Sequence, residues 1–500
     1  MPFTPEAIFQ DFKNNDLDKS SAVDLLISLV DSVEIIKARI DSINIIEKIN
    51  HKDKKVFNFL ENLLIADSNE QIRCQAAKAI KNLFLDECIQ LLKWAFQNDQ
   101  SPKCAICILS LLGELDSNKV TIFLIKKIQE IKKKKYNYNI KDEFTEDVLR
   151  GFSNNELANV LINYIVISFL KIKFGYINYE INQLGVLEKL DLSNIDYQGL
   201  GYNRLEKALE AILSLTPLKQ LDLSNNHIRV LPNEVAEATN LEILDLSFNN
   251  LSNLPESISN CKKLKILNLK SNDLKFLPDS FSRLSSLEML ILRDNNLTEL
   301  PLPLCNVRSL KLIDLHHNKI SQIPSEVDQL THLKELDLAW NKLKQIPNSL
   351  KTLNSLEKLN LGRNSIEQIP AWIDNLTNLK ELQLYDNAIS TLPENMVHLN
   401  NLADLNLRNN RIGLFPKCLF SLISLKMLNL SWNNLTLLPP WIDMLTKLEV
   451  LNLWGNKIES IPETIINLKN IKKIYLNFNK INQMPECLKM LQKTGVSITI

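Results

Sequence analysis

Apolar and polar residues follow two different rhythms along the chain, and the change falls near residue 187. Between about residues 21 and 115, apolar residues recur with the 3.6-residue period of amphipathic helices. From about residue 187 to residue 500, leucines recur in the frame Leu-x-x-Leu-x-Leu instead. The alternation of the last two leucines is typical of a short strand. The pattern therefore predicts an all-α region followed by a region of many short strands.

An asparagine returns every 23 residues through the second region, and no interval deviates. Its members are Asn226, Asn249, Asn272, Asn295, Asn318, Asn341, Asn364, Asn387, Asn410, Asn433, Asn456 and Asn479. The surrounding frame is Leu-x-x-Leu-x-Leu-x-x-Asn-x-Leu-x-x-Leu-Pro, seen plainly in residues 241–255. This frame resembles the leucine-rich repeat. The resemblance implies an α/β solenoid over residues 187–500, shaped as a horseshoe, with parallel strands on its concave face and short helices on its convex face.

Each part of the repeat has a predicted structural role. The strand leucines point inward, and each asparagine is expected to satisfy backbone groups of neighbouring coils as a ladder. The proline after the frame starts a convex helical turn, where a missing N–H costs nothing. The first repeat is irregular: its asparagine position falls on Ile195, 31 residues before Asn226, and we attribute the extra residues to an insertion at about 197–205. Twelve regular repeats follow it, and a closing strand is expected at residues 496–500.

Three segments of the first region align with one another: residues 38–49, 72–83 and 104–115. An Asp-rich turn precedes each one, and their last apolar positions lie 34 and 32 residues apart. That spacing predicts paired antiparallel helices stacked as an α-solenoid. The segment 72–83 is similar to the second helix of a HEAT repeat. We therefore predict a HEAT-like helical domain over residues 1–180, in which a last helix at about 155–172 caps the strand-rich region.

Composition and charge bear on the classes of partner that the protein binds and on its cellular location. The formal net charge is zero, with 58 basic and 58 acidic residues, which argues against nucleic-acid or membrane binding by bulk charge. The most apolar run, residues 157–170, is shorter than the roughly 20 residues that cross a bilayer, so a buried helix is predicted there. The chain starts without a signal-peptide pattern, and its eight cysteines are scattered. We expect a cytoplasmic protein with reduced thiols; the oligomeric state is left open.

The sequence shows no enzyme signature. It contains no P-loop, kinase or Gly-x-Ser-x-Gly motif. Cys104 and Cys107 form a lone Cys-x-x-Cys inside a predicted helix, without two further zinc ligands at a suitable spacing, so core packing is the interpretation. His316 and His317 are adjacent in a predicted strand, where their rings are expected to diverge. The basic run Lys132–Lys135 is interpreted as a solvated helix end, with a patch for an acidic partner as the alternative. We predict no catalysis, cofactor or metal.

The two positions directly before each asparagine vary most between repeats and concentrate Trp, Tyr, Arg and His. Such residues supply much of the binding energy at interface hot spots. We predict one partner-binding patch on the concave face, formed by Arg293, His316, Trp340, Arg363, Tyr385, Arg408, Trp432 and Trp454. The alternative is that aromatic residues before the asparagine only shield the junction between strand and turn, as expected for Phe248.

The Leu-Pro-rich, 23-residue repeats look like those of intracellular Ras-group scaffolds, Scribble-type proteins and plant disease-resistance receptors. This resemblance implies a non-catalytic scaffold that binds protein partners, with a small GTPase as one partner class. A bacterial effector or ubiquitin-ligase-like protein that uses the repeats for substrate recognition is the alternative. It would leave only residues 1–186 for catalysis, and they contain no catalytic pair. A part of a larger receptor is a third hypothesis.

Overall fold

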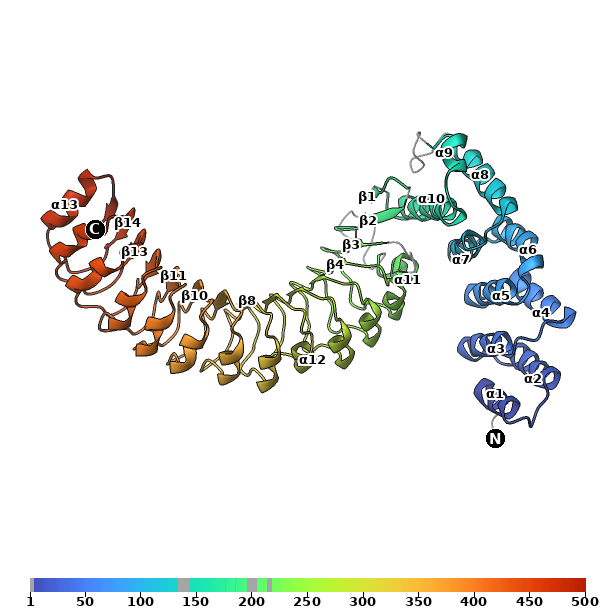
Figure 1. Cartoon of the computed structure of the whole chain (residues 1–500), viewed down its shortest axis with the longest axis horizontal. Helices are drawn as coiled ribbons and strands as arrows, with labels where there is room; N and C mark the ends of the chain where they lie inside the picture. Colours follow the sequence, from blue (N-terminus) through green and yellow to red (C-terminus); the bar gives the residue numbers. More distant parts are fainter. Residues whose placement is uncertain (1–3, 134–143, 176, 185, 196–204, 214–217) are drawn as a thin grey trace. The chain divides into compact units, whose positions relative to one another are not determined.

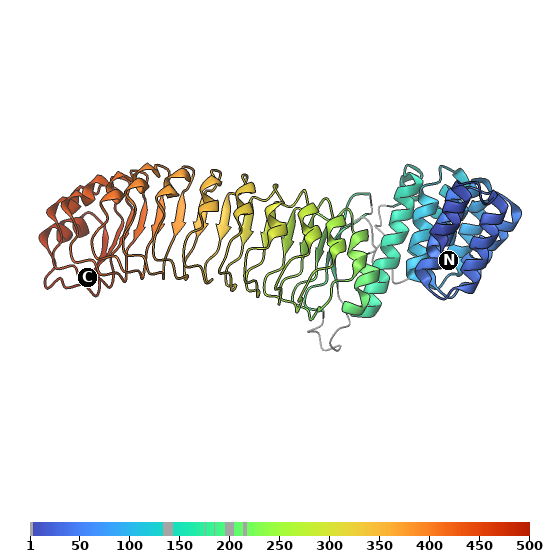
Figure 2. The ribbon, with the colours of Figure 1, turned by 90° about the horizontal axis from the view of Figure 1, so that it is seen from below.

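The computed structural model describes residues 4–133, 144–175, 177–184, 186–195, 205–213 and 218–500. The chain divides into two compact units, Met1–Leu190 and Asp191–Ile500, drawn in Figures 1 and 2. The insertion predicted at 197–205 lies outside the described residues except for Leu205, as do Lys134 and Lys135 of the basic run.

The first unit is built from helices that pack in pairs. They are α1 (Pro5–Lys13), α2 (Lys19–Ser32), α3 (Ile36–Ile49), α4 (Lys54–Ala66), α5 (Glu70–Leu83), α6 (Leu85–Asn98), α7 (Pro102–Gly113), α8 (Asn118–Lys132), α9 (Glu146–Arg150) and α10 (Asn154–Phe174). Helix α2 packs on α3, α4 on α5 and α6 on α7, while α3, α5, α7 and α10 form a continuous stack. The paired helices predicted from the three aligned segments are confirmed, and the segments coincide with α3, α5 and α7.

Arginine–aspartate pairs join consecutive helix pairs of this unit. Arg73 on α5 donates from Nε to Oδ2 of Asp99 (2.7 Å) and from Nη2 to Oδ1 (3.0 Å). Arg39 on α3 makes the equivalent pair with Asp67, one helix pair earlier. Asp67 and Asp99, which lie in two of the Asp-rich turns, therefore each pair with an arginine of the preceding helix pair.

Helix α10 is longer than the apolar run predicted. It spans 21 residues, so the argument from length against a membrane crossing is wrong. Among the described residues it alone is long and apolar enough to cross a bilayer, with a mean hydropathy of 1.6 over an 18-residue window. A little over half of that window, 56%, is buried inside the structure, where α10 packs on α7 and α8. A capping box between Ser153 and Glu156 begins the helix.

Short strands follow one another in sequence order: the first lies in the first unit, the second ends at the boundary between the units, and those from the third onward are parallel. After β1 (Asn178–Ile181) and β2 (Leu187–Asp191) come β3 (Gln220–Asp222), β4 (Ile243–Asp245), β5 (Ile266–Asn268), β6 (Met289–Ile291), β7 (Leu312–Asp314), β8 (Glu335–Asp337), β9 (Lys358–Asn360), β10 (Glu381–Gln383), β11 (Asp404–Asn406), β12 (Met427–Asn429), β13 (Val450–Asn452), β14 (Lys473–Tyr475) and β15 (Ser497–Thr499). Leu244 pairs with Leu267 and Leu359 with Leu382, so the register advances by one repeat per strand. Strand β15 pairs with β14, which confirms the predicted closing strand.

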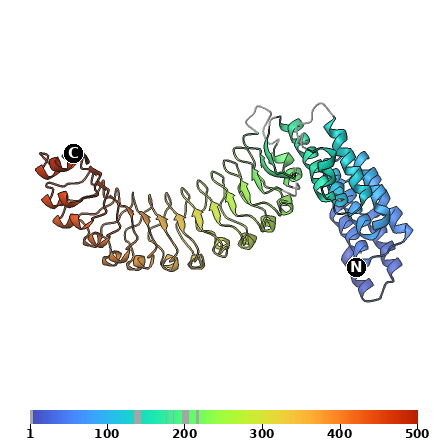
Figure 3. The same cartoon turned by 45° about the horizontal axis from the view of Figure 1, so that its top comes forward.

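Helical turns occupy the convex side of the second unit, and the strands occupy its concave side (Figures 1 and 3). After η1 (Glu206–Ala208) and α11 (Leu209–Leu213), the turns are η2 (Asn233–Glu237), η3 (Glu256–Asn260), η4 (Asp279–Arg283), α12 (Leu302–Cys305), η5 (Ser325–Gln329), η6 (Asn348–Thr352), η7 (Ala371–Asn375), η8 (Glu394–His398), η9 (Lys417–Ser421), η10 (Pro440–Met444), η11 (Glu463–Asn467) and α13 (Glu486–Lys493). Most are five-residue 3₁₀ turns rather than α-helices. The proline, for example Pro255, is the N-cap and not the first helical residue. Each turn from η2 onward buries at least one apolar side chain, such as Ile258 or Ile373.

The asparagines form the predicted ladder. Asn295 donates from Nδ2 to the carbonyls of Leu292 in its own repeat (3.0 Å) and Leu269 in the repeat before (2.9 Å). Its Oδ1 accepts from the N–H of Leu274 (3.0 Å). The same bonds recur one repeat later, where Asn318 donates to Leu292 and accepts from Leu297. Each asparagine therefore satisfies buried backbone groups on two coils.

Candidate functional site

The residue directly before each repeat asparagine, here called the pre-asparagine position, has left-handed backbone in all twelve regular repeats. Its φ is between 49° and 56° from Asn225 to Phe478, apart from Gly455 at 69°. A left-handed residue with a side chain costs roughly 1–2 kcal/mol, and Gly, Asn and Asp tolerate this conformation best. Nevertheless the position holds Phe248, Ser271, His317, Trp340, Arg363, Trp432 and Phe478. Backbone strain at such residues is characteristic of functional surfaces.

Pre-asparagine side chains in the middle of the array contact one another in a continuous network. Asp294 accepts a hydrogen bond from His317 (2.6 Å), and the His317 ring stands edge-on to Trp340 at 5.6 Å. The Arg363 guanidinium lies 3.8 Å from the centre of the Trp340 ring, and its Nε donates to Asp386 (2.8 Å). Burial raises the pKa of Asp294, but the His317 hydrogen bond and the Arg293 charge outweigh it, so that this pKa is lowered. The predicted contact residues Trp340 and Arg363 thus hold each other in place.

His316 and Arg293 lie beside this network, one position earlier in their repeats. The ring centre of His316 is 6.2 Å from that of Trp340. Both histidine rings therefore face the same indole, and the predicted divergence is wrong because left-handed His317 does not continue the strand. Nδ1 of His316 is buried without a hydrogen-bond partner, 3.6 Å from Asp337 Oδ1. Nε of Arg293 is also buried without a hydrogen-bond partner, 3.6 Å from Asp294 Oδ2.

Tyr385 and Arg408 occupy the same position as His316 in later repeats, with different surroundings. The Tyr385 ring covers Gly362: a Cβ on that glycine would lie 2.3 Å from the ring. Burial, followed by the charge of Asp337, raises the pKa of Tyr385. Arg408 is exposed, and its guanidinium makes no ion pair or hydrogen bond with the described residues.

Three aromatic side chains cluster at the C-terminal end of the concave face. Trp432 and Trp454 have ring centres 6.4 Å apart, and Phe478 stacks on Trp454 at 5.9 Å with ring planes 12° apart. Their exposed fractions are 48%, 38% and 73%. Trp432 also lies over Gly455, where an added Cβ would come within 2.9 Å of the indole. Phe478 was missed by the sequence prediction, although it occupies the same pre-asparagine position as Trp432.

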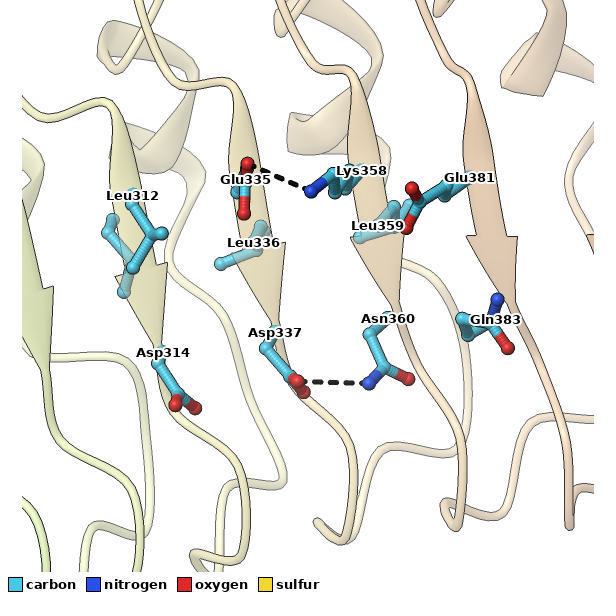
Figure 4. A pocket seen from close by; sticks show the side chains of 11 residues that line it. Leu312, Asp314, Glu335, Leu336, Asp337, Lys358, Leu359, Asn360, Glu381 and Gln383 are labelled. Carbon is cyan, nitrogen blue, oxygen red and sulfur yellow. Dashed lines mark hydrogen bonds and ion pairs between the residues drawn. The ribbon is translucent and has the colours of Figure 1, made fainter. Parts of the chain in front are cut away.

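A shallow hollow of about 230 Å³ lies on the strands themselves, across β7 to β10 (Figure 4). Its lining includes Asp314, Glu335, Asp337, Lys358 and Glu381. Lys358 pairs with Glu335 (3.2 Å), and this bond raises the pKa of the lysine. Burial, followed by the charge of Asp337, raises the pKa of Asp314. The prediction missed this hollow because it did not consider the first residue of each strand, which also faces the concave side.

The polar residue that ends most strands has a structural role. The carboxylate of Asp337 accepts from the N–H of Ala339 two residues later (2.8 Å), and Asn360 does the same for Gly362 (3.1 Å). These bonds turn the chain out of the strand. In the described part of the chain, no group of three or more His, Cys, Asp or Glu side chains is placed to hold a metal ion. The eight cysteines are free thiols.

The predicted site residues therefore fall into two groups. The structure brings Arg293, His316, Trp340 and Arg363 together in the middle of the array, where they contact one another or their acidic neighbours, and Tyr385 covers Gly362, the residue before Arg363. Trp432 and Trp454 lie further along with Phe478, and Arg408 lies between the two groups in sequence. Their role in binding stays a prediction.

Comparison with known proteins places the repeats in one family. Three family models match: a leucine-rich repeat region over residues 168–299, a leucine-rich repeat over 308–366 and 354–412, and paired leucine-rich repeats over 423–463 and 446–489. No curated protein matches the sequence.

Solved structures of similar sequence are also leucine-rich repeat proteins or bear such a domain. A leucine-rich repeat protein of Leptospira interrogans is 32% identical, over 64% of this chain and 91% of that one, with a TM-score of 0.49. An internalin of Listeria monocytogenes is 24% identical, over 62% and 86%, with a TM-score of 0.53. The leucine-rich repeat ectodomain of an Arabidopsis thaliana membrane receptor kinase, solved with CASPARIAN STRIP INTEGRITY FACTOR 2, is 30% identical, over 57% and 38%, with a TM-score of 0.46.

The asparagine ladder, the parallel strands in register and the family matches agree. The chain belongs to the leucine-rich repeat proteins.

Proposed function

We propose that this protein is a non-catalytic scaffold that binds a protein partner through the concave face of its repeats. The observation that carries the proposal is the exposed aromatic cluster of Trp432, Trp454 and Phe478. Large apolar side chains that gather on a surface mark contact sites, and tryptophan is among the residues most enriched at hot spots. Two of the three rings stand on strained left-handed residues, which stability alone does not favour.

The middle of the concave face supports the same proposal in a different way. Trp340 and Arg363 are held by each other and by Asp386, so their geometry is fixed before any partner arrives. A preorganised surface loses less side-chain entropy on binding.

A small GTPase is the first partner class to test, because the repeats resemble those of Ras-group scaffolds. We also propose a reducing, cytoplasmic setting. Six of the eight free cysteines are buried, and burial raises the pKa of Cys261 to about 11 and that of Cys418 to about 11, which keeps these thiols protonated and unreactive.

Affinity purification with mass spectrometry tests the proposal, using the full chain and the double variant Arg408→Glu/Trp454→Ala. We expect the variant to lose the partners that the wild type recovers, while its melting temperature changes by only a few degrees. The matched control is Lys351→Glu/Trp372→Ala, which removes one lysine and one tryptophan from the convex turns η6 and η7.

Unchanged recovery by the concave-face variant, or equal loss by both variants, would contradict the proposal. If small GTPases are among the recovered proteins, the next measurement compares their binding in the GTP-bound and GDP-bound states. A preference for one nucleotide state is the expected result for a signalling scaffold.

A further inference from the structure

The last four regular repeats bring basic and aromatic residues to one surface. Their segments 402–411, 425–434, 448–457 and 471–480 each run from the strand to one residue past the asparagine. Together they contain seven basic and two acidic residues. The corresponding segments of the four preceding repeats, 310–319, 333–342, 356–365 and 379–388, contain seven basic and six acidic residues. The excess of positive charge is therefore confined to the C-terminal end.

The basic side chains of the two regions also differ in how many of them form ion pairs. In the middle of the array, Arg363 pairs with Asp386, Lys358 with Glu335, and Lys380 with Glu357. At the C-terminal end, by contrast, Arg408, Arg411, Lys457 and Lys473 are exposed and form no side-chain hydrogen bond or ion pair with any residue that the structure describes. Lys480 makes only a 3.4 Å contact with Glu459. Arg408, Arg411, Lys457 and Lys473 are therefore free to pair with groups on another molecule.

These cations lie in the same four repeats as the aromatic cluster. Arg408 occupies the position that Trp454 occupies two repeats later, and Arg411, Lys457 and Lys480 each follow a repeat asparagine, two residues after the pre-asparagine position. We define the C-terminal aromatic–basic surface as Trp432, Trp454 and Phe478 with Arg408, Arg411, Lys457, Lys473 and Lys480. Its exposed rings are here called the apolar centre, and its cations, which belong to the same four repeats, the basic margin.

We propose that the C-terminal aromatic–basic surface binds an acidic segment of a protein partner, whose carboxylates pair with the basic margin while an apolar or aromatic side chain packs on the rings. The inference rests on the proposed scaffold function and specifies the chemistry of the partner. An apolar centre inside a charged margin is the usual anatomy of a protein interface. Complementary charge also accelerates encounter and orients the partner.

The geometry of the rings favours a polypeptide over a single-stranded nucleic acid. Nucleic-acid bases bind such surfaces by stacking on free aromatic faces. Here Trp454 is stacked on Phe478, and Trp432 lies over the backbone of Gly455. The rings cover part of one another's faces, which leaves less of each face for a base to stack on, while the exposed apolar area still suits aliphatic and aromatic side chains of a protein.

Fluorescence anisotropy of the full chain tests this inference with three labelled probes: a glutamate–tyrosine copolymer, a lysine–tyrosine copolymer of the same length, and oligothymidylate. We expect the glutamate–tyrosine copolymer to bind and the lysine–tyrosine copolymer not to. Trp454→Ala is expected to weaken binding about tenfold or more, as at a hot spot. Arg411→Glu/Lys457→Glu is expected to weaken it by about the same factor, because each reversal turns an attraction into a repulsion.

The matched control is Lys319→Glu/Lys342→Glu, which makes the same charge change at the same repeat position in earlier repeats. Lys342 lies three strands before Arg411, about 14 Å at 4.8 Å per strand. That distance exceeds the Debye length of about 8 Å at physiological salt, so binding should change by less than about twofold.

Equal losses in the two charge pairs would show attraction by overall charge and overturn the inference. Tighter binding of oligothymidylate, weakened by Trp454→Ala, would reassign the surface to nucleic acid. Failure of the glutamate–tyrosine copolymer to bind would refute the acidic-partner chemistry. The scaffold proposal is refuted separately, by unchanged partner recovery in the Arg408→Glu/Trp454→Ala variant.

Discussion

Neighbouring asparagines of the ladder are expected to be energetically coupled, because they share acceptors. The carbonyl of Leu292 accepts from Asn295 (3.0 Å) and from Asn318 (3.0 Å). When Asn295→Ala removes the first donor, the second remains. The single substitution leaves the buried N–H of Leu274 without a partner, because this N–H donates to Asn295 Oδ1. One such orphaned group costs about 1–3 kcal/mol, which is the expected destabilisation.

The double variant Asn295→Ala/Asn318→Ala removes both donors from the Leu292 carbonyl. Its destabilisation is therefore expected to exceed the sum of the two single variants by about 1–3 kcal/mol, the cost of one more buried unpaired group. The control pair is Asn272→Ala/Asn341→Ala. These two asparagines donate to Leu246, Leu269 and Lys270, and to Leu315, Leu338 and Ala339, with no acceptor in common. Their effects are expected to add within about 0.5 kcal/mol.

Equilibrium urea unfolding of the full chain, followed by tryptophan fluorescence, measures both pairs. Five of the six tryptophans lie beyond residue 190, so the signal reports on the repeat unit. Additivity in the adjacent pair, equal to that in the separated pair, would refute the account of the ladder. It would mean that the carbonyl finds water or another donor once its asparagines are gone.

Two further predictions concern packing and charge. Gly362→Ala places a Cβ 2.3 Å from the Tyr385 ring and is expected to lower the free energy of unfolding in urea by about 1–3 kcal/mol. The control Gly413→Ala meets nothing within 4 Å and is expected to change that free energy by less than about 0.5 kcal/mol. Equal effects of the two substitutions would contradict this packing. Burial raises the pKa of Asp99, but hydrogen bonds from Arg73, Cys104 and Ser101 outweigh it and lower the pKa overall. Because the folded pKa is below the ordinary value of about 3.9, the stabilisation by Asp99 is present above pH 4 and is lost as the pH falls through the lowered pKa. In thermal melts followed by the helical circular dichroism signal, Asp99→Asn is therefore expected to be less stable than the wild type by about 3–5 kcal/mol at pH 7. On acidification the variant is expected to lose less stability than the wild type, because only the wild type has the Asp99 carboxylate to protonate. Parallel stability–pH profiles of the two proteins would contradict this account.

The strand register and the ladder could be predicted from the sequence because they depend on local, repeated chemistry. A leucine or isoleucine at the centre of the strand in every regular repeat, with an asparagine at every turn, leaves one consistent register, since a slip would expose the core. The length of α10 was not predictable in the same way. Its ends are set by a capping box at Ser153 and by Gly175, not by the apolar run alone. The ion pair of Arg73 with Asp99 likewise could not be predicted without the structure, because the two residues lie 26 positions apart in the sequence.

The candidate site was predicted only in part, and the reason is the backbone. Reading the repeat as a strand up to the asparagine places His316 and His317 on opposite faces. The left-handed residue before each asparagine breaks that alternation, and side chains at both positions then face the same neighbours, as the contacts of Trp340 show. The sequence indicates this turn only in part: five of the twelve pre-asparagine residues, Asn225, Asp294, Asp386, Asn409 and Gly455, are of the types that adopt left-handed backbone most easily, and the other seven are not.

The same backbone distinguishes the two groups of candidate residues. At Trp340 and Arg363, the cost of a left-handed conformation is offset by their mutual contact and by the bond to Asp386. Phe478 has the same strain, yet 73% of its side chain remains exposed, and Trp432 is 48% exposed. Glycine or asparagine would adopt this conformation at lower cost. The most exposed ring at a left-handed residue, Phe478, therefore lies at the C-terminal end, in the repeats that also hold the unpaired cations, and an intermolecular contact is the interaction that would cover it.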